Sequence, residues 1–322
     1  MTVLEAIQKS TEFLGKKGVE SPRLQTELLL AHLLGLPRMK LYLNFDRTLT
    51  PAETDALREF VKRRGQREPL QHIIGSVSFC GLEIAVNRHA LVPRPETELL
   101  AEAGWQFLNG RADLPVGQGA RQRVPTNALD LGTGTGCIAI ALAVKCPKAK
   151  ITATDISADA LALARENAAR NGVTERIEFL PGHGFAALQS EGHGSRVPEV
   201  NAPTHVGDPQ RSSLQKFDLI ISNPPYIPSS EIATVQPEVR DFDPRAALDG
   251  GAEGLDFYRM FSEQAKPFLK TDGKIMLEFG DGQAEAIRRI FQTEKWIVEA
   301  VKEDYSHRAR IMIAQSSSSS SS

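Results

Sequence analysis

The stretch ALDLGTGTGC (residues 128–137) ends a short apolar run with Gly132, Gly134 and Gly136. The apolar run predicts a buried strand, and the residues that follow, CIAIALAVKC, predict a helix. Glycine lets the backbone turn sharply and approach a ligand closely, while the start of a helix offers free N–H groups. Several classes of nucleotide-binding enzyme use such a turn, so it predicts a ligand site without choosing between the classes.

The alternation of strand and helix continues towards the C-terminal end. KITATDIS, RIEFLPG, FDLIISN and GKIMLEFG predict further strands, separated by segments such as ADALALARENAARNG that predict helices. WIVEAVKED and RARIMIAQ would close the sheet. This pattern predicts an α/β fold, with a mostly parallel sheet covered by helices on both faces.

The N-terminal part of the chain has a different sequence pattern, which predicts helices followed by a hairpin. Ser21 and Thr50 each precede a proline and are expected to cap helices. VSFCGLEIAV predicts a β-hairpin, and two polar segments, 109–125 and 190–213, are expected to be inserted loops. The expected organisation is a helical domain at 1–75, a hairpin and connector at 76–98, an α/β domain at 99–315 and a low-complexity serine tail at 316–322.

The composition excludes some classes of protein. Lys and Arg number 38 and Asp and Glu 40, so a net charge of −2 gives no overall field that would hold a polyanion. Cys80, Cys137 and Cys146 lack metal-ligand spacing, which favours free thiols, no metal site and a cytoplasmic location. No apolar run approaches the roughly 18 residues of a membrane span.

Two acidic residues, Asp130 and Asp155, are associated with the glycine turn. Asp130 is part of the turn, together with Thr133 and Thr135. Asp155 ends the next predicted strand, where an acid is placed to accept hydrogen bonds from the ribose hydroxyls of an adenosine. Ser157 fills the alternative role of helix N-cap, so we assign Asp155 to the ligand.

A second motif, Asn223-Pro224-Pro225-Tyr226, follows the fourth predicted strand. Each proline fixes φ and lacks an N–H group, so the motif is a stiff elbow. The carboxyl ends of parallel strands meet at one edge, which brings the elbow beside the glycine turn. This arrangement favours a methyltransferase over a nicotinamide oxidoreductase, because no hydride-transfer residue is apparent. A non-catalytic binding module on the same fold stays an alternative.

Together these motifs resemble the class I S-adenosylmethionine-dependent methyltransferases, and N-P-P-Y is similar to the motif of enzymes that methylate planar nitrogens of adenine, cytosine or glutamine. Four further stretches extend the resemblance to the PrmC/HemK family: EPLQHIIG (68–75), LVPRPETE (91–98), AALDGGAEGLDFYR (246–259) and LEFGDGQ (277–283). That family methylates the glutamine N5 of the GGQ motif in class-1 peptide-chain release factors. The PRPETE stretch favours it over a related enzyme that modifies a ribosomal protein.

The resemblance implies S-adenosylmethionine as cofactor and S-adenosylhomocysteine as product. The cofactor-binding residues would be Asp130, Gly132, Thr133, Gly134, Thr135, Gly136, Asp155 and Asn223. The side-chain oxygen of Asn223 and the carbonyl of Pro224 would accept the two N–H bonds of the substrate amide, with Pro225 beside them and Tyr226 packed on the amide plane. The expected partner is a release factor docked by the helical domain of a monomer, with no membrane and no nucleic-acid substrate. Glutamine in a ribosomal protein and adenine in a nucleic acid stay alternatives.

The chain departs from the family pattern after the third predicted strand. His183 and Gly184 stand where an acid and an aromatic residue are usual, and Phe185 is expected to replace the lost apolar contact. Glu278 and Gln283 are interpreted as either site-lining or helix-capping residues. The basic cluster 62–64 with Arg67 is interpreted as a solvated helix end or a docking surface for the partner.

Overall fold

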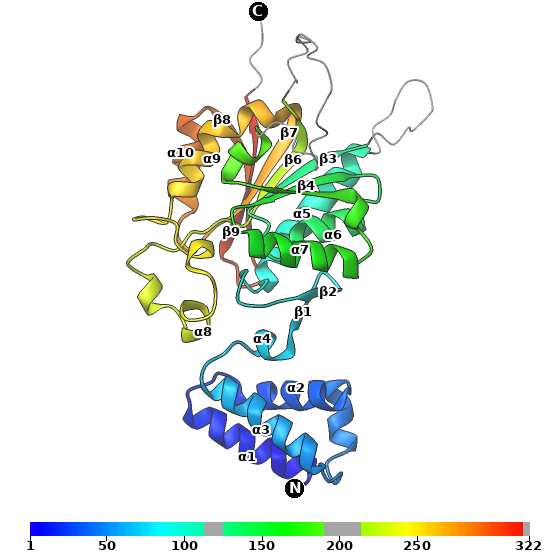
Figure 1. Ribbon diagram of the computed structural model, residues 1–322. Coiled ribbons are helices and arrows are strands. Elements are labelled where there is room, and N and C mark those ends of the chain that lie inside the picture. Colours follow the sequence, from blue (N-terminus) through cyan, green and yellow to red (C-terminus); the bar gives the residue numbers. More distant parts are fainter. Residues whose placement is uncertain (113–124, 190–213, 318–322) are drawn as a thin grey trace, which may run out of the picture.

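The computed structural model describes residues 1–112, 125–189 and 214–317. A helical domain lies at one end of the molecule and an α/β domain at the other, with a small hairpin between them (Figure 1). Residues 113–124, 190–213 and 318–322, which hold most of the two expected insertions and of the serine tail, lie outside the described residues. Residues 109–112, which we assigned to the first insertion, are instead the last turn of a helix.

The helical domain is built from α1 (Val3–Lys16), α2 (Pro22–Leu34), η1 (Arg38–Leu43), α3 (Pro51–Gly65) and α4 (Leu70–Ile74). Thr50 caps α3 as predicted, since its hydroxyl accepts from Glu53 N and the Glu53 carboxylate accepts from Thr50 N. The prediction that Ser21 caps α2 is wrong. Ser21 has a left-handed φ of 47°, whereas a capping residue is extended, and its side chain makes no capping hydrogen bond.

The hairpin pairs β1 (Ser76–Phe79) with β2 (Leu82–Ala85) in antiparallel register. One buried amide joins it to the α/β domain: Asn167 Oδ1 accepts from Ala85 N, and Asn167 Nδ2 donates to the carbonyls of Ala85 and Thr135. Because Thr135 lies in the glycine turn, the hairpin is held directly against that turn.

The described part of the α/β domain contains a seven-stranded sheet in the order β5-β4-β3-β6-β7-β9-β8. The first five strands in this order are parallel, and β9 pairs antiparallel with both β7 and β8. The strands are β3 (Asn127–Leu131), β4 (Lys150–Asp155), β5 (Ile177–Pro181), β6 (Phe217–Ser222), β7 (Leu269–Glu278), β8 (Trp296–Glu303) and β9 (Ala309–Ser316).

Side chains alternate between the faces of the central strands, so the sheet has an apolar core on each side. Ala128 of β3 and Leu219 of β6 are buried in one core, and Leu129 and Ile220 are buried in the other. The predicted mostly parallel α/β fold, covered on both faces, is confirmed. The covering helices are α5 (Pro95–Ala112), α6 (Cys137–Lys145) and α7 (Ala158–Arg170) on one side, and α9 (Asp256–Gln264) and α10 (Ala284–Thr293) on the other (Figure 1).

Short helical turns connect these elements. They are η2 (Thr174–Arg176), η3 (Gly184–Leu188), η4 (Ile232–Thr234), α8 (Pro237–Arg240), η5 (Arg245–Ala247) and η6 (Lys266–Phe268). Across the described ranges, none of the helices is both long and apolar enough to cross a membrane.

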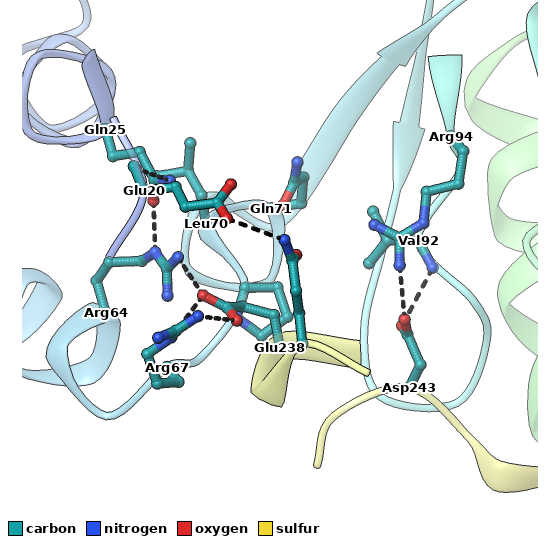
Figure 2. Close-up of a pocket in the computed structure, with 12 residues that line it drawn as sticks. Glu20, Gln25, Arg64, Arg67, Leu70, Gln71, Val92, Arg94, Glu238 and Asp243 are labelled. Carbon is teal, nitrogen blue, oxygen red and sulfur yellow. Dashed lines mark hydrogen bonds and ion pairs between the residues drawn. The ribbon is translucent and has the colours of Figure 1, made fainter. Parts of the chain in front are cut away.

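The basic cluster at the end of α3 joins the two domains. Arg64 Nη2 and Arg67 Nη2 each lie 2.6 Å from a carboxylate oxygen of Glu238 in α8 (Figure 2). Arg63 pairs with Glu68 instead, and the Arg64 side chain is only 4% exposed. The interpretation of this cluster as a solvated helix end is therefore wrong for Arg64 and Arg67, because α8 supplies them with an acidic partner from far along the chain, whereas Lys62 is exposed.

These ion pairs also change the pKa of Glu238, and with it the pH range in which the carboxylate is charged. Burial disfavours the carboxylate, but hydrogen bonds from Arg67 and Arg64 outweigh it and lower the pKa of Glu238 from 4.5 to about 2. The contribution of this group to stability is thus complete above pH 4.5 and is lost as the pH falls towards 2.

Replacing Glu238→Gln should lower the free energy of unfolding at pH 7 by about 2 kcal/mol, because two arginines lose their charged acceptor. Chemical denaturation measures this change. Glu231→Gln, an exposed change in the same connecting segment, is the matched control and should leave stability unchanged within about 0.5 kcal/mol. Equal stability of the two variants would contradict the domain-joining role.

Candidate active site

A cavity of about 330 Å³ opens at the carboxyl ends of β3, β4 and β6, where the strand order reverses. The predicted site residues that line it are Gly132, Thr133, Gly134, Thr135, Asp155, Asn223, Pro224 and Pro225. Among the described residues, Asp130, Gly136 and Tyr226 are predicted site residues that lie outside its wall. The topology therefore brings the glycine turn and the proline elbow to one cavity.

Asp130 supports the glycine turn from behind. It is fully buried, and its Oδ2 accepts from the Thr133 hydroxyl at 2.6 Å and from Ala139 N at 3.2 Å. Burial raises the pKa of Asp130 to about 7, with the two hydrogen bonds opposing that rise. Its carboxyl group thus holds both the turn and the start of α6, while its Oδ1 is buried without a partner, and a role of Asp130 at the cofactor stays a prediction.

The glycines of the turn serve two different purposes. Gly132 and Gly134 border the cavity with φ of 76° and 55°, and a Cβ on Gly132 would meet no protein atom within 4 Å. A Cβ on Gly136, at φ 81°, would lie 3.0 Å from Ala164 Cβ in α7. The first two glycines therefore leave space at the cavity wall, and the third lets α6 and α7 pack closely.

Asp155 lines the cavity and forms hydrogen bonds with the backbone of the turn. Its Oδ2 accepts from Gly134 N and its Oδ1 from Ser157 N, both at 2.8 Å. Ser157 caps α7 as predicted, because its hydroxyl accepts from Ala160 N at 3.2 Å. Asp155 thus lines the cavity while it orders the backbone on both sides.

The elbow places Asn223 and Pro224, each with a hydrogen-bond acceptor, in the cavity wall. Asn223 Nδ2 donates to the Thr97 hydroxyl at 3.0 Å, whereas Asn223 Oδ1 is buried without a partner. Among the described residues, no hydrogen bond occupies the carbonyl of Pro224, the next residue. A buried acceptor without a partner is costly, so the site is suited to a ligand that brings N–H groups.

Two sequence families match the chain in tandem. The PrmC N-terminal domain matches residues 5–75, and a methyltransferase domain matches residues 123–316. The release factor glutamine methyltransferase of Geobacter sulfurreducens is 41% identical, over 90% of this chain and 88% of that protein. The one from Chlorobaculum tepidum is 38% identical, over 88% of this chain and 87% of its own length. The chain belongs to the release factor glutamine methyltransferase family.

A third relative has a broader name. The bifunctional methyltransferase of Rickettsia conorii is 33% identical over 97% of this chain, which corresponds to 57% of the longer relative. The resemblance to the PrmC/HemK family, predicted from four short stretches, is confirmed by these matches.

Two of the family stretches, AALDGGAEGLDFYR (246–259) and LEFGDGQ (277–283), contact the elbow. Gln283 Nε2 donates to the Tyr226 carbonyl at 2.9 Å, and Gln283 Oε1 accepts from Gly280 N at 2.9 Å. A Cβ on Gly250 would lie 2.9 Å from the Pro225 carbonyl oxygen. The predicted roles of Gln283 as a capping or site-lining residue are therefore wrong, because its amide fastens the elbow instead.

Tyr226, the last residue of the elbow, is not among the residues that line the cavity. Its ring is half-buried and packs against the core beneath α9 and α10, and burial raises the pKa of its hydroxyl to about 12. A stacking role on the substrate amide stays a prediction for this residue.

His183 and Gly184, the two departures from the family pattern, both line the cavity. The prediction that Phe185 replaces the lost apolar contact is wrong. Its ring is 1% exposed and stacks on Phe268, with centroids 5.1 Å apart, inside the core. Gly184 has a φ of 55°, so the chain reverses there and turns Phe185 inward.

The sequence reasoning missed Thr97 as a site residue. Thr97 lines the cavity and is 2% exposed, yet it lies in the first turn of α5, in a stretch whose strongest sequence feature is its prolines. Its position in the PRPETE stretch was the one available signal.

Replacing Gly136→Ala should lower the free energy of unfolding by about 3 kcal/mol, since a left-handed φ and a 3.0 Å contact with Ala164 add together. Gly172→Ala is the control, because Gly172 also has positive φ, 68°, but no atom within 4 Å of the added carbon. Denaturant unfolding should show the control losing only the backbone penalty, about 1 kcal/mol. Equal losses would refute the packing role.

Proposed function

We propose that this protein transfers a methyl group from S-adenosylmethionine to the side-chain amide nitrogen of the glutamine in the GGQ motif of class-1 peptide-chain release factors. The observation that carries the proposal is the unpartnered Oδ1 of Asn223 beside the Pro224 carbonyl, in the same cavity as the glycine turn. Similarity to enzymes with that name, over 88–90% of this chain, supports the substrate.

The cavity fits the proposed cofactor. Its volume of about 330 Å³ lies at the lower end of the usual range for small-molecule sites. Gly132 leaves open space where a side chain would stand, and Asp155 places a carboxylate at the wall to receive ribose hydroxyls. When bound, S-adenosylmethionine supplies an electrophilic methyl group.

The elbow is suited to the chemistry of a planar NH2 group. The nitrogen of an amide is a poor nucleophile because its lone pair is delocalised into the carbonyl. Asn223 Oδ1 and the Pro224 carbonyl would each accept one N–H of the glutamine. Positive charge develops on that nitrogen in the transition state, so both hydrogen bonds strengthen there. The prolines orient the acceptors before the substrate arrives.

The partner must be chosen by other parts of the molecule, because the same two acceptors fit the NH2 group of adenine. The PrmC-type helical domain is the proposed docking element for a release factor. With a net charge of −2, the chain lacks the overall positive field that supports binding to long nucleic acids. We propose that the enzyme acts as a monomer in the cytoplasm.

The proposal is tested with purified protein, labelled S-adenosylmethionine, a bacterial release factor, its GGQ→GGA variant and a DNA oligonucleotide. Label on the wild-type factor alone, located at the GGQ glutamine by mass spectrometry, is the expected result. Label on DNA would favour an adenine methyltransferase. Cofactor binding without transfer to any of these would overturn the release-factor assignment.

Asn223→Ala should cut kcat by about 100-fold or more, because it removes an acceptor that matters most in the transition state. The affinity for S-adenosylmethionine, measured by calorimetry, should change less than about threefold. Single-turnover methylation at saturating cofactor measures the loss. A variant with wild-type kcat would rule out the acceptor role.

Asp155→Asn should weaken S-adenosylmethionine binding by about 10-fold, since the amide is a poorer acceptor for ribose hydroxyls than a carboxylate. Asp272→Asn, at an exposed position of β7 outside the cavity wall, is the matched control and should bind normally. Calorimetric titration of both variants checks the assignment. Equal affinities would show that Asp155 serves the turn and not the cofactor.

A further inference from the structure

The segment after the elbow, residues 227–249, is a loop that lies between the α/β domain and the helical domain (Figure 1). Its two ends are held together, because Ile227 N donates to the Leu248 carbonyl and Gly250 N donates to the Ile227 carbonyl, both at 2.9 Å. A Cβ on Gly250 would lie 2.9 Å from the Pro225 carbonyl oxygen. The base of the loop is therefore packed directly against the elbow.

The tip of this loop is bound to the helical domain. Arg67 contacts both oxygens of the Glu238 carboxylate, with Nε 2.7 Å from Oε1 and Nη2 2.6 Å from Oε2 (Figure 2). Arg64 Nη2 donates to Oε1 of the same group at 2.6 Å, and Gln236 Nε2 donates to Glu20 Oε1 at 3.2 Å. A guanidinium that contacts both carboxylate oxygens fixes their orientation as well as their distance, so these contacts fix the tip relative to α3.

The returning half of the loop forms part of the cavity wall. Asp243 is 6% exposed and accepts from Arg94 Nη2 at 2.8 Å and from Val92 N at 3.4 Å. The residues that follow it line the same cavity as the elbow: Pro244, Ala246 and Ala247. The loop is thus held at its tip by Glu238 and just before the cavity wall by Asp243.

We propose that Glu238 and Asp243 are positioning residues, which hold the loop so that its wall segment, residues 244–247, orients the substrate beside the elbow. This inference rests on the proposed function, because the wall segment shares a cavity with the two acceptors proposed for the glutamine. Among the described residues that line this cavity, neither Glu238 nor Asp243 is present, so both act through the wall segment. The helical domain then contributes to turnover as well as to docking.

A direct contact of the partner with the arginines of α3 is the alternative. The side chain of Arg64 is 4% exposed and that of Arg67 is 23% exposed, so little of either is open to a partner. The two explanations differ in how changes combine. If Arg67 acts only through Glu238, its loss has no further effect once Glu238 is replaced, whereas independent contacts with a partner give losses that add.

The kinetic test compares Glu238→Gln, Arg67→Gln and the double variant with the wild type in methylation of a release factor. Glu238→Gln should lower kcat by about 10-fold, because a wall segment that is free to move orients the substrate less well. The double variant should match Glu238→Gln within about twofold. The affinity for S-adenosylmethionine, measured by calorimetry, should change less than about threefold, since the glycine turn and Asp155 lie on other strands.

Two further variants complete the set. Asp243→Asn should lower kcat at least as much as Glu238→Gln does, because it lies next to the wall segment. Glu231→Gln, an exposed change in the same loop, is the matched control and should keep the wild-type kcat. Circular dichroism at the assay temperature checks that every variant is folded, so that a lower kcat reports positioning and not unfolding.

The outcomes separate this inference from the proposed function. If the wild type methylates the release factor but Glu238→Gln and Asp243→Asn keep its kcat, or change only the KM for the factor, the positioning role is wrong. Additive losses in the double variant would overturn it as well, in favour of direct contact with the partner.

If the wild type transfers no methyl group, the proposed function fails, and the loop is then judged by hydrogen exchange. The amides of Ala247 and Leu248 donate within the turn η5, to the carbonyls of Pro244 and Arg245. In Glu238→Gln they should exchange faster than in the wild type by about 10-fold or more, because the wall segment opens more often. Glu231→Gln should exchange like the wild type. Unchanged exchange in Glu238→Gln would overturn the inference independently of activity.

Discussion

The arrangement of the site depends on the left-handed glycine turn after β3. Four neighbours hold it by hydrogen bonds. The Thr154 carbonyl of β4 accepts from Gly132 N and Thr133 N, and Asp155 accepts from Gly134 N. Asp130 accepts from the Thr133 hydroxyl, and Asn167 of α7 donates to the Thr135 carbonyl. Because Asn167 also holds the hairpin, the position of the connector is fixed relative to the same turn. A cavity wall made of backbone is rigid only when its amides are satisfied in this way.

The connector after the hairpin separates two cavities. In the stretch 91–94, Leu91 and Pro93 line the cavity of the candidate active site, whereas Val92 and Arg94 line a second cavity of about 180 Å³ between the domains (Figure 2). This alternation is what an extended segment produces, since successive side chains point to opposite sides. Arg94 also pairs with buried Asp243 at 2.8 Å. One short segment is therefore shared by the candidate active site and the contact between domains.

Most features that depend on neighbours in sequence could be predicted, although the N-cap predicted at Ser21 was wrong, and features that depend on distant partners could not. The Thr50 cap, the Ser157 cap and the positive φ of the glycines follow from local backbone geometry. The acidic partner of Arg67 lies 171 residues away, so the charge pattern around α3 alone pointed to solvent. Phe185 was misplaced for a similar reason, because its stacking partner Phe268 comes from η6, far along the chain.

Hydrogen bonds behind the elbow explain why motifs extend beyond the residues that touch a ligand. Thr97 Oγ1 accepts from Asn223 Nδ2 at 3.0 Å, and the Oδ1 end of that amide is left without a protein partner. Gln283 Nε2 donates to the Tyr226 carbonyl at the other end of the elbow. The PRPETE and LEFGDGQ stretches, distant in sequence, thus meet at the two ends of one short motif and hold it in place.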